Sequence, residues 1–540
     1  MAYFRLLFFF ALSFTATLAV NAPSSSHSRP PYPNSPTLDA HNKSLVKSLC
    51  SSAPYPDTCF DTFKVSISIG INPNIIGFLL QSLKTALSET QKLTDLFAKA
   101  GGSSGIIEKQ KGTVQDCQEL HQKSLFSLKK SVDKIKNAPD VKTYLSASLT
   151  NRVTCLEGLD SATGPLKPTL VNSMADTYKY VSNSLSLLSK PGSPHGGKQG
   201  RRLLGFPRWL SRKSRSILQS SGEDYDPSSI LTVAQDGTGN FTTIGEAIEF
   251  APDNSPDRVI IFVKTGLYDE NVVIPSQKTN IVLLGDGIDA TVITGNRSVG
   301  DGWTTFRSAT LAVSGEGFLA RGISVYNTAG PAKGQAVALR VNADLAALYQ
   351  CSFVGYQDTL YAHSFRQFYR ECDVYGTVDF IFGNAAVVFQ GCNLVARRPL
   401  PGQSNIFTAQ SRTDEYETTG ISIQNCSILA ADDLDAATTK SYLGRPWRPY
   451  SRTVYIESFI DDLIVPAGWS EWSGGNGTGL DTLYYGEYGN SGPGAGTAQR
   501  VTWPGYHVMS YEDALQFTVS EFITGEDWLG STSFPYDDGV

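Results

Sequence analysis

A 21-residue repeat in the second half of the chain most constrains its fold. Residues 351–358 and 372–379 both read Cys-x-apolar-x-Gly-x-x-Asp, and both continue into aromatic and apolar residues. Weaker copies begin at Cys392 and Cys426. A period near 21 with alternating β-branched and aromatic residues is typical of a solenoid of short stacked strands.

The repeat predicts a cluster of polar side chains. Residues one period apart occupy neighbouring coils, whose strands lie about 4.8 Å apart. We therefore expect Asp358 and Asp379 to be close neighbours, with Gln335 and Gln357 beside them. Two carboxyls at that spacing do not both ionise freely, so one can donate a proton while the other acts as nucleophile or base. The competing interpretation is purely structural, with these side chains bonded to backbone or water.

Four segments around this repeat resemble the signature segments of plant pectin methylesterases. They are Gly-Gln-Ala-Val-Ala-Leu-Arg at 334–340, Gly-Tyr-Gln-Asp-Thr-Leu-Tyr at 355–361, Gly-Thr-Val-Asp-Phe-Ile-Phe-Gly at 376–383 and Leu-Gly-Arg-Pro-Trp at 443–447. The resemblance covers roughly the last 310 residues, which makes it more specific than a short motif. One departure is Gly334, where the family commonly has His.

The resemblance implies an aspartyl esterase that hydrolyses the methyl esters of galacturonate in pectin and releases methanol. Asp379 would be the nucleophile, held anionic and oriented by Arg445, whose guanidinium can grip a carboxylate with two bonds. Asp358 would be the proton donor and then the base. The amides of Gln335 and Gln357 would stabilise the oxyanion.

Further residues are candidates for binding the sugar rings along a groove. Aromatic side chains suit this role, although for Phe306 and Phe380 packing in the core is an equal alternative. The predicted substrate-binding set is Gln335, Arg445, Thr305, Phe306, Tyr361, Phe380, Trp447 and Trp469.

Short β-branched runs separated by Gly, Asp and Asn begin at Leu231 and include residues 259–263, 280–284 and 311–313. They predict an all-β C-terminal domain, a right-handed parallel β-helix over residues 220–540. At 540 residues the chain is long enough for two or more domains. From residue 216 onward it has 18 Lys and Arg against 38 Asp and Glu, and this acidic balance argues against nucleic acid as a partner.

The N-terminus predicts secretion. Residues 1–22 read as a signal peptide, with Arg5 ahead of an apolar run and small residues at the cleavage site; a retained signal anchor is the alternative. Residues 23–40 are a disordered Ser/Pro-rich segment. The expected location is the cell wall, with no membrane attachment after signal removal. N-glycosylation sequons fit that route and occur at Asn42, Asn240, Asn296, Asn425 and Asn476.

Residues 41–189 predict an all-α four-helix bundle. Apolar residues recur at intervals of three and four, and breakers at residues 101–102, 137–139 and 164–165 separate the segments. The spacing of Cys50 and Cys59 and the residues before Cys155 resemble the plant invertase and pectin methylesterase inhibitor family. We expect the disulfides Cys50–Cys59 and Cys117–Cys155. This pro-region either covers the catalytic cleft or only assists folding and export.

Residues 190–219 are a linker with two basic clusters, which predict proteolytic processing after Arg202 or Arg215. The predicted partners are therefore methyl-esterified pectin, the chain's own pro-region, separate inhibitor proteins and a processing protease.

The cysteines of the repeat predict two further disulfides. Adjacent coils bring Cys351 and Cys372 within reach of one another, and Cys392–Cys426 is the complementary pair. A buried ladder of free thiols is the alternative.

Other functions are weighed against the esterase. A Ser-His-Asp esterase is disfavoured, because only His363 lies near the predicted site and no Gly-x-Ser-x-Gly motif occurs. A β-helical pectin lyase or hydrolase, or a non-catalytic inhibitor or wall-binding protein, remains the alternative. No cofactor and no metal site are predicted.

Overall fold

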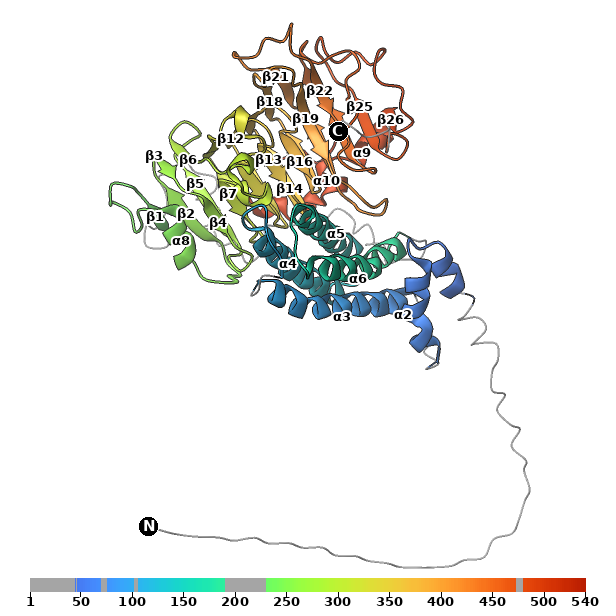
Figure 1. Ribbon diagram of the computed structural model, residues 1–540. Helices are drawn as coiled ribbons and strands as arrows, with labels where there is room; N and C mark the ends of the chain where they lie inside the picture. The colour runs from blue at the N-terminus through green and yellow to red at the C-terminus, as the bar shows by residue number, and fades with distance from the viewer. Residues whose placement is uncertain (1–43, 45, 69–74, 102–104, 190–229, 473–478) are drawn as a thin grey trace, which may run out of the picture.

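The computed structural model describes residues 44, 46–68, 75–101, 105–189, 230–472 and 479–540. Helices in residues 44–189, here called the helical region, lie against a solenoid of parallel strands in residues 230–540, here called the β-helix (Figure 1). The predicted signal peptide, the Ser/Pro-rich segment and the processing sites at Arg202 and Arg215 lie outside the described residues.

The helices of the helical region begin and end near the expected breakers. The longest of them ends at Gly101, and Asn137 caps another by accepting a hydrogen bond from the Asp140 amide at 3.4 Å. The described helices are α2 (Pro56–Ser68), α3 (Ile75–Gly101), α4 (Thr113–Asp133), α5 (Ala138–Asp160) and α6 (Lys167–Leu187).

The β-helix consists of three parallel sheets. The eleven-stranded sheet contains β1 (Leu231–Val233), β2 (Val259–Val263), β5 (Ile281–Gly285), β8 (Leu319–Arg321), β11 (Ala346–Tyr349), β14 (Arg366–Arg370), β17 (Ala386–Gln390), β20 (Gly420–Gln424), β23 (Arg452–Ile456), β25 (Tyr484–Tyr488) and β26 (Tyr506–Val508). The eight-stranded sheet contains β3 (Gly266–Asp269), β6 (Thr291–Gly295), β9 (Ser324–Asn327), β12 (Ser352–Val354), β15 (Asp373–Gly376), β18 (Asn393–Ala396), β21 (Ser427–Ala430) and β24 (Phe459–Ile460). The seven-stranded sheet contains β4 (Val272–Ile274), β7 (Leu311–Val313), β10 (Leu339–Val341), β13 (Leu360–Ala362), β16 (Ile381–Gly383), β19 (Asn405–Gln410) and β22 (Ser441–Gly444).

Short helices cover parts of the β-helix that would otherwise expose apolar surface. The α8 helix (Ile244–Phe250) begins with a capping box between Thr243 and Glu246 and packs onto the first coils. Near the C-terminus, α9 (Tyr511–Leu515) and α10 (Val519–Phe522) cover the outer face of the eleven-stranded sheet. The expected parallel β-helix is therefore confirmed, with one continuous apolar interior.

The outer face of the seven-stranded sheet is covered by the helical region. Ala312, Tyr361, Phe382 and Ala409 come from four different strands of this sheet and share one buried apolar cluster with the helices. No helix among the described residues is long and apolar enough to cross a bilayer.

The two disulfides expected in the helical region are present. Cys50 and Cys59 form one bridge, and Cys117 and Cys155 join α4 to α5. The two disulfides expected in the β-helix are absent, because Cys351, Cys372, Cys392 and Cys426 are free and buried. The predicted Cys351–Cys372 and Cys392–Cys426 pairs are therefore wrong.

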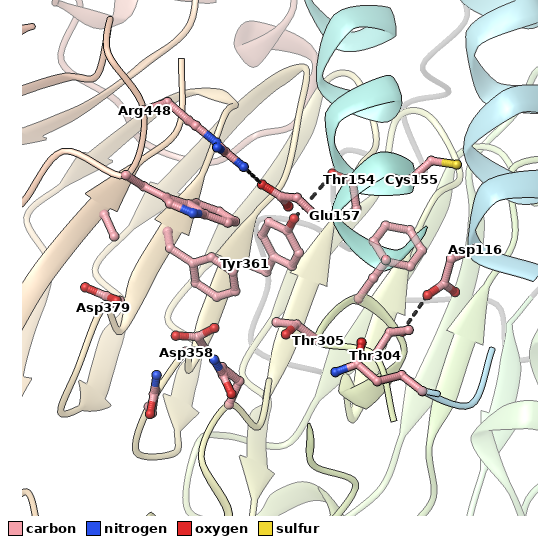
Figure 2. Close-up of a pocket in the computed structure, with 18 of the residues that line it drawn as sticks. Asp116, Thr154, Cys155, Glu157, Thr304, Thr305, Asp358, Tyr361, Asp379 and Arg448 are labelled. Atoms are coloured by element: carbon pink, nitrogen blue, oxygen red, sulfur yellow. Dashed lines mark hydrogen bonds and ion pairs between the residues drawn. The ribbon is translucent and has the colours of Figure 1, made fainter. Parts of the chain in front are cut away.

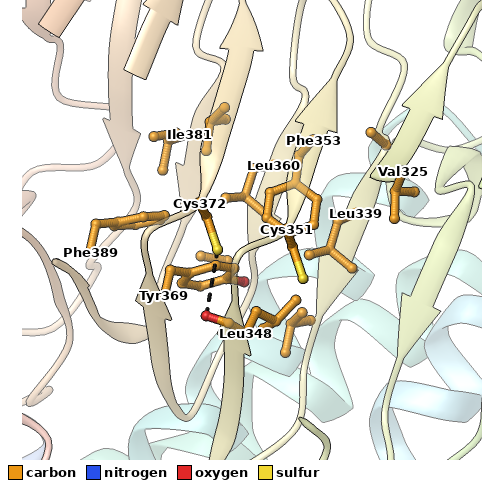
Figure 3. Packing of buried hydrophobic residues seen from close by; sticks show 14 of the residues in the cluster. Val325, Leu339, Leu348, Cys351, Phe353, Leu360, Tyr369, Cys372, Ile381 and Phe389 are labelled. Atoms are coloured by element: carbon orange, nitrogen blue, oxygen red, sulfur yellow. Dashed lines mark hydrogen bonds between the residues drawn. The ribbon is translucent and has the colours of Figure 1, made fainter. Parts of the chain in front are cut away.

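Stacking explains why these thiols stay reduced. Equivalent cysteines on adjacent coils project inward side by side, whereas a disulfide needs side chains that converge. The sulfurs also accept backbone hydrogen bonds along the stack: the Cys372 amide donates to Cys392 Sγ at 3.4 Å, and the Cys392 amide donates to Cys426 Sγ at 3.3 Å. Around them, Tyr369, Leu348 and Phe389 fill the interior (Figure 3).

Three of the predicted sequons lie in the described residues, at Asn240, Asn296 and Asn425, and all three are exposed. Asn42 and Asn476 lie outside the described residues. Glycosylation at each position stays a prediction.

The thiol ladder predicts the outcome of a thiol titration. Of the eight cysteines, the four in the β-helix should react with Ellman's reagent only after unfolding, because burial shields them in the native chain. Without reductant, we expect no fast-reacting thiol in buffer and four in denaturant. Zero thiols in denaturant would instead show that the β-helix carries disulfides.

Candidate active site

Two aspartates occupy equivalent corners of adjacent coils. Asp358 and Asp379 have left-handed backbones, with φ of 65° and 51°, and lie just ahead of β13 and β16. Asp is one of the few residues that tolerates this conformation, and such strain is common at functional sites. The strands pair with Leu360 opposite Ile381, so the two aspartates are in register. The structure therefore brings the carboxyls together as the repeat predicts.

Arg445 fixes one of the two carboxylates. It follows β22 and donates from Nε to Asp379 Oδ1 at 2.8 Å and from Nη2 to Asp379 Oδ2 at 2.7 Å. Its guanidinium lies 4.3 Å from the ring centre of Trp472, which in turn stacks on Trp447. The bidentate bond and the aromatic neighbour together hold the Asp379 carboxylate in one orientation.

The two aspartates line a cavity of about 480 Å³ beneath the helical region (Figure 2). Most of the predicted site residues line the same cavity: Thr305, Phe306, Gln335, Gln357, Asp358, Tyr361, Asp379, Arg445 and Trp447.

The structure corrects two of the predicted substrate contacts. Phe380 is fully buried and packs against Phe407 in the interior of the β-helix. Trp469 is also internal, where it stacks on Tyr485 and donates a hydrogen bond to Glu487. Phe380 precedes β16 and Trp469 lies outside the named strands, so the alternation of side chains along a strand does not predict the direction of either ring.

The pKa values of the two carboxyls are shifted unequally. Burial raises the pKa of Asp358 well above its usual range, and the charge of Asp379 raises it further while Arg445 opposes both effects. Burial also raises the pKa of Asp379, but the hydrogen bonds and charge of Arg445 oppose this rise. The pair therefore shares a proton, with Asp379 the more readily ionised member.

Carboxylates of the helical region reach into the same cavity. Asp116 of α4 accepts a hydrogen bond from Thr304 and pairs with Arg307 Nε at 2.7 Å. Glu157 of α5 forms an ion pair with Arg448. Burial raises the pKa of Asp116 to about 6 although Arg307 opposes the rise. Figure 2 shows the Thr304–Asp116 hydrogen bond and the Arg448–Glu157 ion pair, which both cross from the helical region to the β-helix.

Similarity to known proteins agrees with this geometry. A family model described as Pectinesterase matches residues 230–526. A probable pectinesterase/pectinesterase inhibitor 12 from Arabidopsis thaliana is 61% identical over 527 residues, which cover 94% of this chain and 96% of the relative. The chain belongs to the pectinesterase family.

Other pectinesterases extend this similarity. Pectinesterase 2 from Citrus sinensis is 46% identical over 92% of this chain and 95% of its own. The structure of a pectin methylesterase from carrot matches with a TM-score of 0.57 and 51% identity, over 59% of this chain and all of that one. A second family model, described as plant invertase/pectin methylesterase inhibitor, matches residues 44–187. This pectinesterase thus carries an inhibitor-like helical region.

Several cavity residues were missed by the sequence analysis. Phe382, Trp472 and Arg448 line the cavity together with the predicted set. Phe380 precedes β16 and packs inward, whereas Phe382 lies within β16 and faces the cavity. Trp472 lies three residues after the internal Trp469 and also faces the cavity. Arg448 follows Trp447 directly and had the clearest signal, a cation next to the family motif.

Gly334, the position where the family commonly has His, has a backbone that favours glycine. Its φ is 69° and its ψ is −140°, which side-chain-bearing residues rarely adopt. Its neighbour Gln335 nevertheless lines the cavity. Within the described residues, no group of three or more His, Cys, Asp or Glu side chains is placed to hold a metal ion.

The shared proton predicts a bell-shaped pH profile of pectinesterase activity once the helical region is released. With Asp379 as the predicted nucleophile and Asp358 as the predicted proton donor, activity should fall at acid pH, where Asp379 becomes protonated, and again at alkaline pH, where Asp358 ionises. Arg445→Gln removes the charge that opposes both raised pKa values. We therefore expect both limbs to move to higher pH and the maximum rate to fall at least about tenfold.

Rates of methanol release across the pH range would check this expectation. Arg398→Gln, which removes an exposed guanidinium outside the cavity, is the matched control. If the acid and alkaline sides of the pH profile do not move in Arg445→Gln, Arg445 does not set the ionisation of Asp358 and Asp379.

Proposed function

We propose that this pectinesterase hydrolyses methyl esters of galacturonate units in plant cell-wall pectin and releases methanol. The observation that carries the proposal is the Asp379 carboxylate, gripped by Arg445 and placed beside Asp358. The amides of Gln335 and Gln357 line the same cavity. These groups supply a nucleophile, a proton donor and two hydrogen-bond donors for acyl transfer.

The proposed reaction proceeds in two halves. The Asp379 carboxylate attacks the ester carbonyl carbon, and the negative charge that develops on the carbonyl oxygen is bound by Gln335 and Gln357. The C–O bond to the methoxy group then breaks, and Asp358 transfers its proton to the departing methanol. A water molecule, deprotonated by Asp358, attacks the resulting anhydride, which frees the galacturonate carboxyl and regenerates Asp379.

A serine esterase finds no comparable support. His363 Nδ1 lies 2.9 Å from Ser364 Oγ, which resembles a nucleophile and its base. Both residues are fully buried beneath α5, and neither lines the cavity. Burial lowers the pKa of His363 well below its ordinary value, and its Nε2 lies 2.9 Å from Thr154 of α5.

The helical region is proposed to hold the enzyme inactive until it is cut away. Its residues Asp116, Thr154 and Glu157 line the cavity, so the polymer cannot reach the aspartates while α4 and α5 are docked. Ion pairs between Arg366 and Asp140 and between Lys130 and Glu316 add to the interface.

The processing proposal places cleavage by a protease after Arg202 or Arg215, which gives a mature enzyme of about residues 220–540. Secretion to the cell wall would deliver it to pectin. A separate inhibitor protein resembling the helical region would be able to bind the same uncovered face.

Removal of the nucleophile should abolish activity. We expect the parent chain, cleaved at a protease site introduced between residues 190 and 229, to release methanol from highly esterified pectin. Asp379→Asn should lower kcat by about 10³-fold or more, because an amide neither attacks the ester nor carries the required charge. Asp432→Asn, an exposed carboxyl outside the cavity, is the matched control. Full activity of the Asp379→Asn variant would rule out the proposed mechanism.

Because the helical region covers the cavity, we expect the intact chain to have little activity until it is cleaved. We expect the uncleaved protein to release methanol at least about tenfold more slowly than the same preparation after cleavage and separation of the helical region. Asp116→Asn with Glu157→Gln should raise the activity of the uncleaved chain, because two cross-interface ion pairs are lost. Glu89→Gln, within α3 and ion-paired with Lys92 of the same helix, should leave latency unchanged. Equal rates before and after cleavage would leave the helical region with a folding or export role alone.

A further inference from the structure

A second cavity, here called the seam cavity, lies where the helical region meets the β-helix. Its volume is about 640 Å³. It is lined mainly by the start of α5, by the loop between β19 and β20 (residues 411–419) and by the C-terminal segment 516–524. The loop is joined to the helical region, because the Thr418 amide donates a hydrogen bond to Ser146 Oγ of α5 at 3.2 Å. None of the described residues that line this cavity also lines the cavity of Asp358 and Asp379, so the two sites are separate.

Two arginines of the β-helix line the seam cavity without an ion-pair partner. Arg412 donates hydrogen bonds to the main-chain carbonyls of Glu417, at 2.9 Å, and Tyr450, at 3.4 Å. Arg452 donates to the carbonyls of Thr419, at 2.7 Å, and Glu417, at 3.2 Å. Among the described residues, neither guanidinium forms an ion pair with a carboxylate, so neither charge is neutralised by direct contact with an anion.

A third cation reaches the cavity from the helical region. Lys142 of α5 is half-buried and, in the part of the chain that the structure describes, has no ion-pair partner either. By contrast, Arg366, which lines the same cavity, is paired with Asp140 at 2.9 Å and with Asp344 at 2.8 Å. The first turn of α5 also lines the cavity, and the positive end of its helix dipole adds to the field. The seam cavity therefore gathers positive charge from both parts of the chain.

This arrangement is costly for the chain alone. Burial lowers the pKa of Arg412, although the charges of Glu417 and Asp414 oppose the change. Burial lowers the pKa of Arg452 well below its ordinary value, and the charge of Arg412 lowers it further. Burial also lowers the pKa of Lys142. A buried charge without a partner is unfavourable, so an anion bound among these three cations offsets the cost.

One buried carboxyl lines the seam cavity but carries only part of a negative charge. Glu417 is fully buried, and burial raises its pKa to about 7, with the charge of Asp414 adding to the rise. Its Oε2 accepts a hydrogen bond from the Thr413 amide at 2.9 Å, whereas its Oε1 has no partner among the described residues. Below neutral pH this carboxyl is mostly protonated and leaves the guanidiniums uncompensated. A hydroxyl group of a ligand would give Oε1 the partner that it lacks.

The apolar side of the cavity indicates an organic ligand rather than an inorganic ion. Phe517 and Phe522 line it, and the Arg452 guanidinium lies 5.9 Å and 5.6 Å from their ring centres. Thr143 and Gln516 add polar groups. A volume of about 640 Å³ is within the range of small-molecule sites and much larger than an inorganic anion needs. Aromatic rings beside hydrogen-bonding groups and cations suit a sugar ring that carries a carboxylate.

We propose that the seam cavity binds a small sugar acid, with its carboxylate between Arg412, Arg452 and Lys142. The ring of the ligand packs on Phe517 and Phe522. The ligand bridges two parts of the chain, because Lys142 belongs to the helical region and the two arginines belong to the β-helix. A ligand that needs both parts stabilises the docked arrangement by mass action. This inference adds a second ligand site to the chain and does not depend on the esterase reaction.

Calorimetry with the intact, uncleaved chain tests the site. We expect galacturonate to bind the parent, and to bind Arg452→Gln at least about tenfold and Lys142→Gln at least about fivefold more weakly, because each variant removes one cation. Lys129→Gln, which removes an exposed lysine of α4 outside the cavity, is the matched control and should keep the parent's affinity. No binding by the parent, or equal binding by both variants, overturns the proposal. If Arg452→Gln does not fold, Lys142→Gln still decides, because its half-buried side chain has no ion-pair partner in the described structure.

Two further ligands test the chemistry of the site. Galactose has a hydroxymethyl group in place of the carboxylate of galacturonate, and it should bind at least about tenfold more weakly. Inorganic phosphate has the charge but no ring, and it should also bind more weakly than galacturonate. Equal binding of galactose would show that the cations do not select the ligand. Equal or tighter binding of phosphate would show a site for an inorganic anion, and either result overturns the assignment to a sugar acid.

Release of the helical region tests the bridge. The chain is cleaved at a protease site introduced between residues 190 and 229, and dissociation of its two parts is followed by surface plasmon resonance. We expect galacturonate to slow this dissociation at least about threefold in the parent and to leave it unchanged in Lys142→Gln. An unchanged rate in the parent overturns the proposal. A faster rate also overturns it, because galacturonate would then compete with the helical region instead of joining it to the β-helix.

Discussion

The in-register pairing of adjacent coils is the constraint on which the rest of the structure depends. Leu360 pairs with Ile381, and this register alone sets Asp358 against Asp379. A slip of one residue would turn every side chain of the strand to the opposite face. The same register aligns the apolar interior, so the free energy that stabilises the β-helix also fixes the relative position of the two aspartates that we propose to be catalytic.

Arg445 converts this pair of like charges into two different groups. Without a cation, two buried carboxyls in register would share their proton more equally. With both guanidinium bonds directed to Asp379, that carboxyl is the more easily ionised, and Asp358 keeps the proton. The pairing of the strands therefore brings the two carboxyls together, and Arg445, which follows β22, makes their pKa values different.

The sequence analysis predicted the features that follow from the 21-residue spacing of the repeat. It missed the features that depend on the direction in which a side chain points. The 21-residue spacing led to the parallel coils and to the cluster of Asp and Gln residues, because a repeat determines which residues are neighbours. It did not reveal that Phe382 and Trp472 face the cavity while Phe380 and Trp469 face inward. It also failed for Cys351 and Cys372, because proximity of two stacked thiols says nothing about whether their sulfurs converge. The contacts between Asp116 and Arg307 and between Glu157 and Arg448 join distant parts of the chain and carry no local signal.

The apolar outer face of the seven-stranded sheet has a consequence for biosynthesis. Tyr361, Phe382 and Ala409 would meet water if the β-helix assembled alone, and exposed strands of this kind promote aggregation during folding. The helical region precedes the sheet in the chain and therefore leaves the ribosome first. The order of synthesis would thus make a folded partner for this surface available when the coils stack, and we infer that the helical region can limit aggregation of the nascent enzyme.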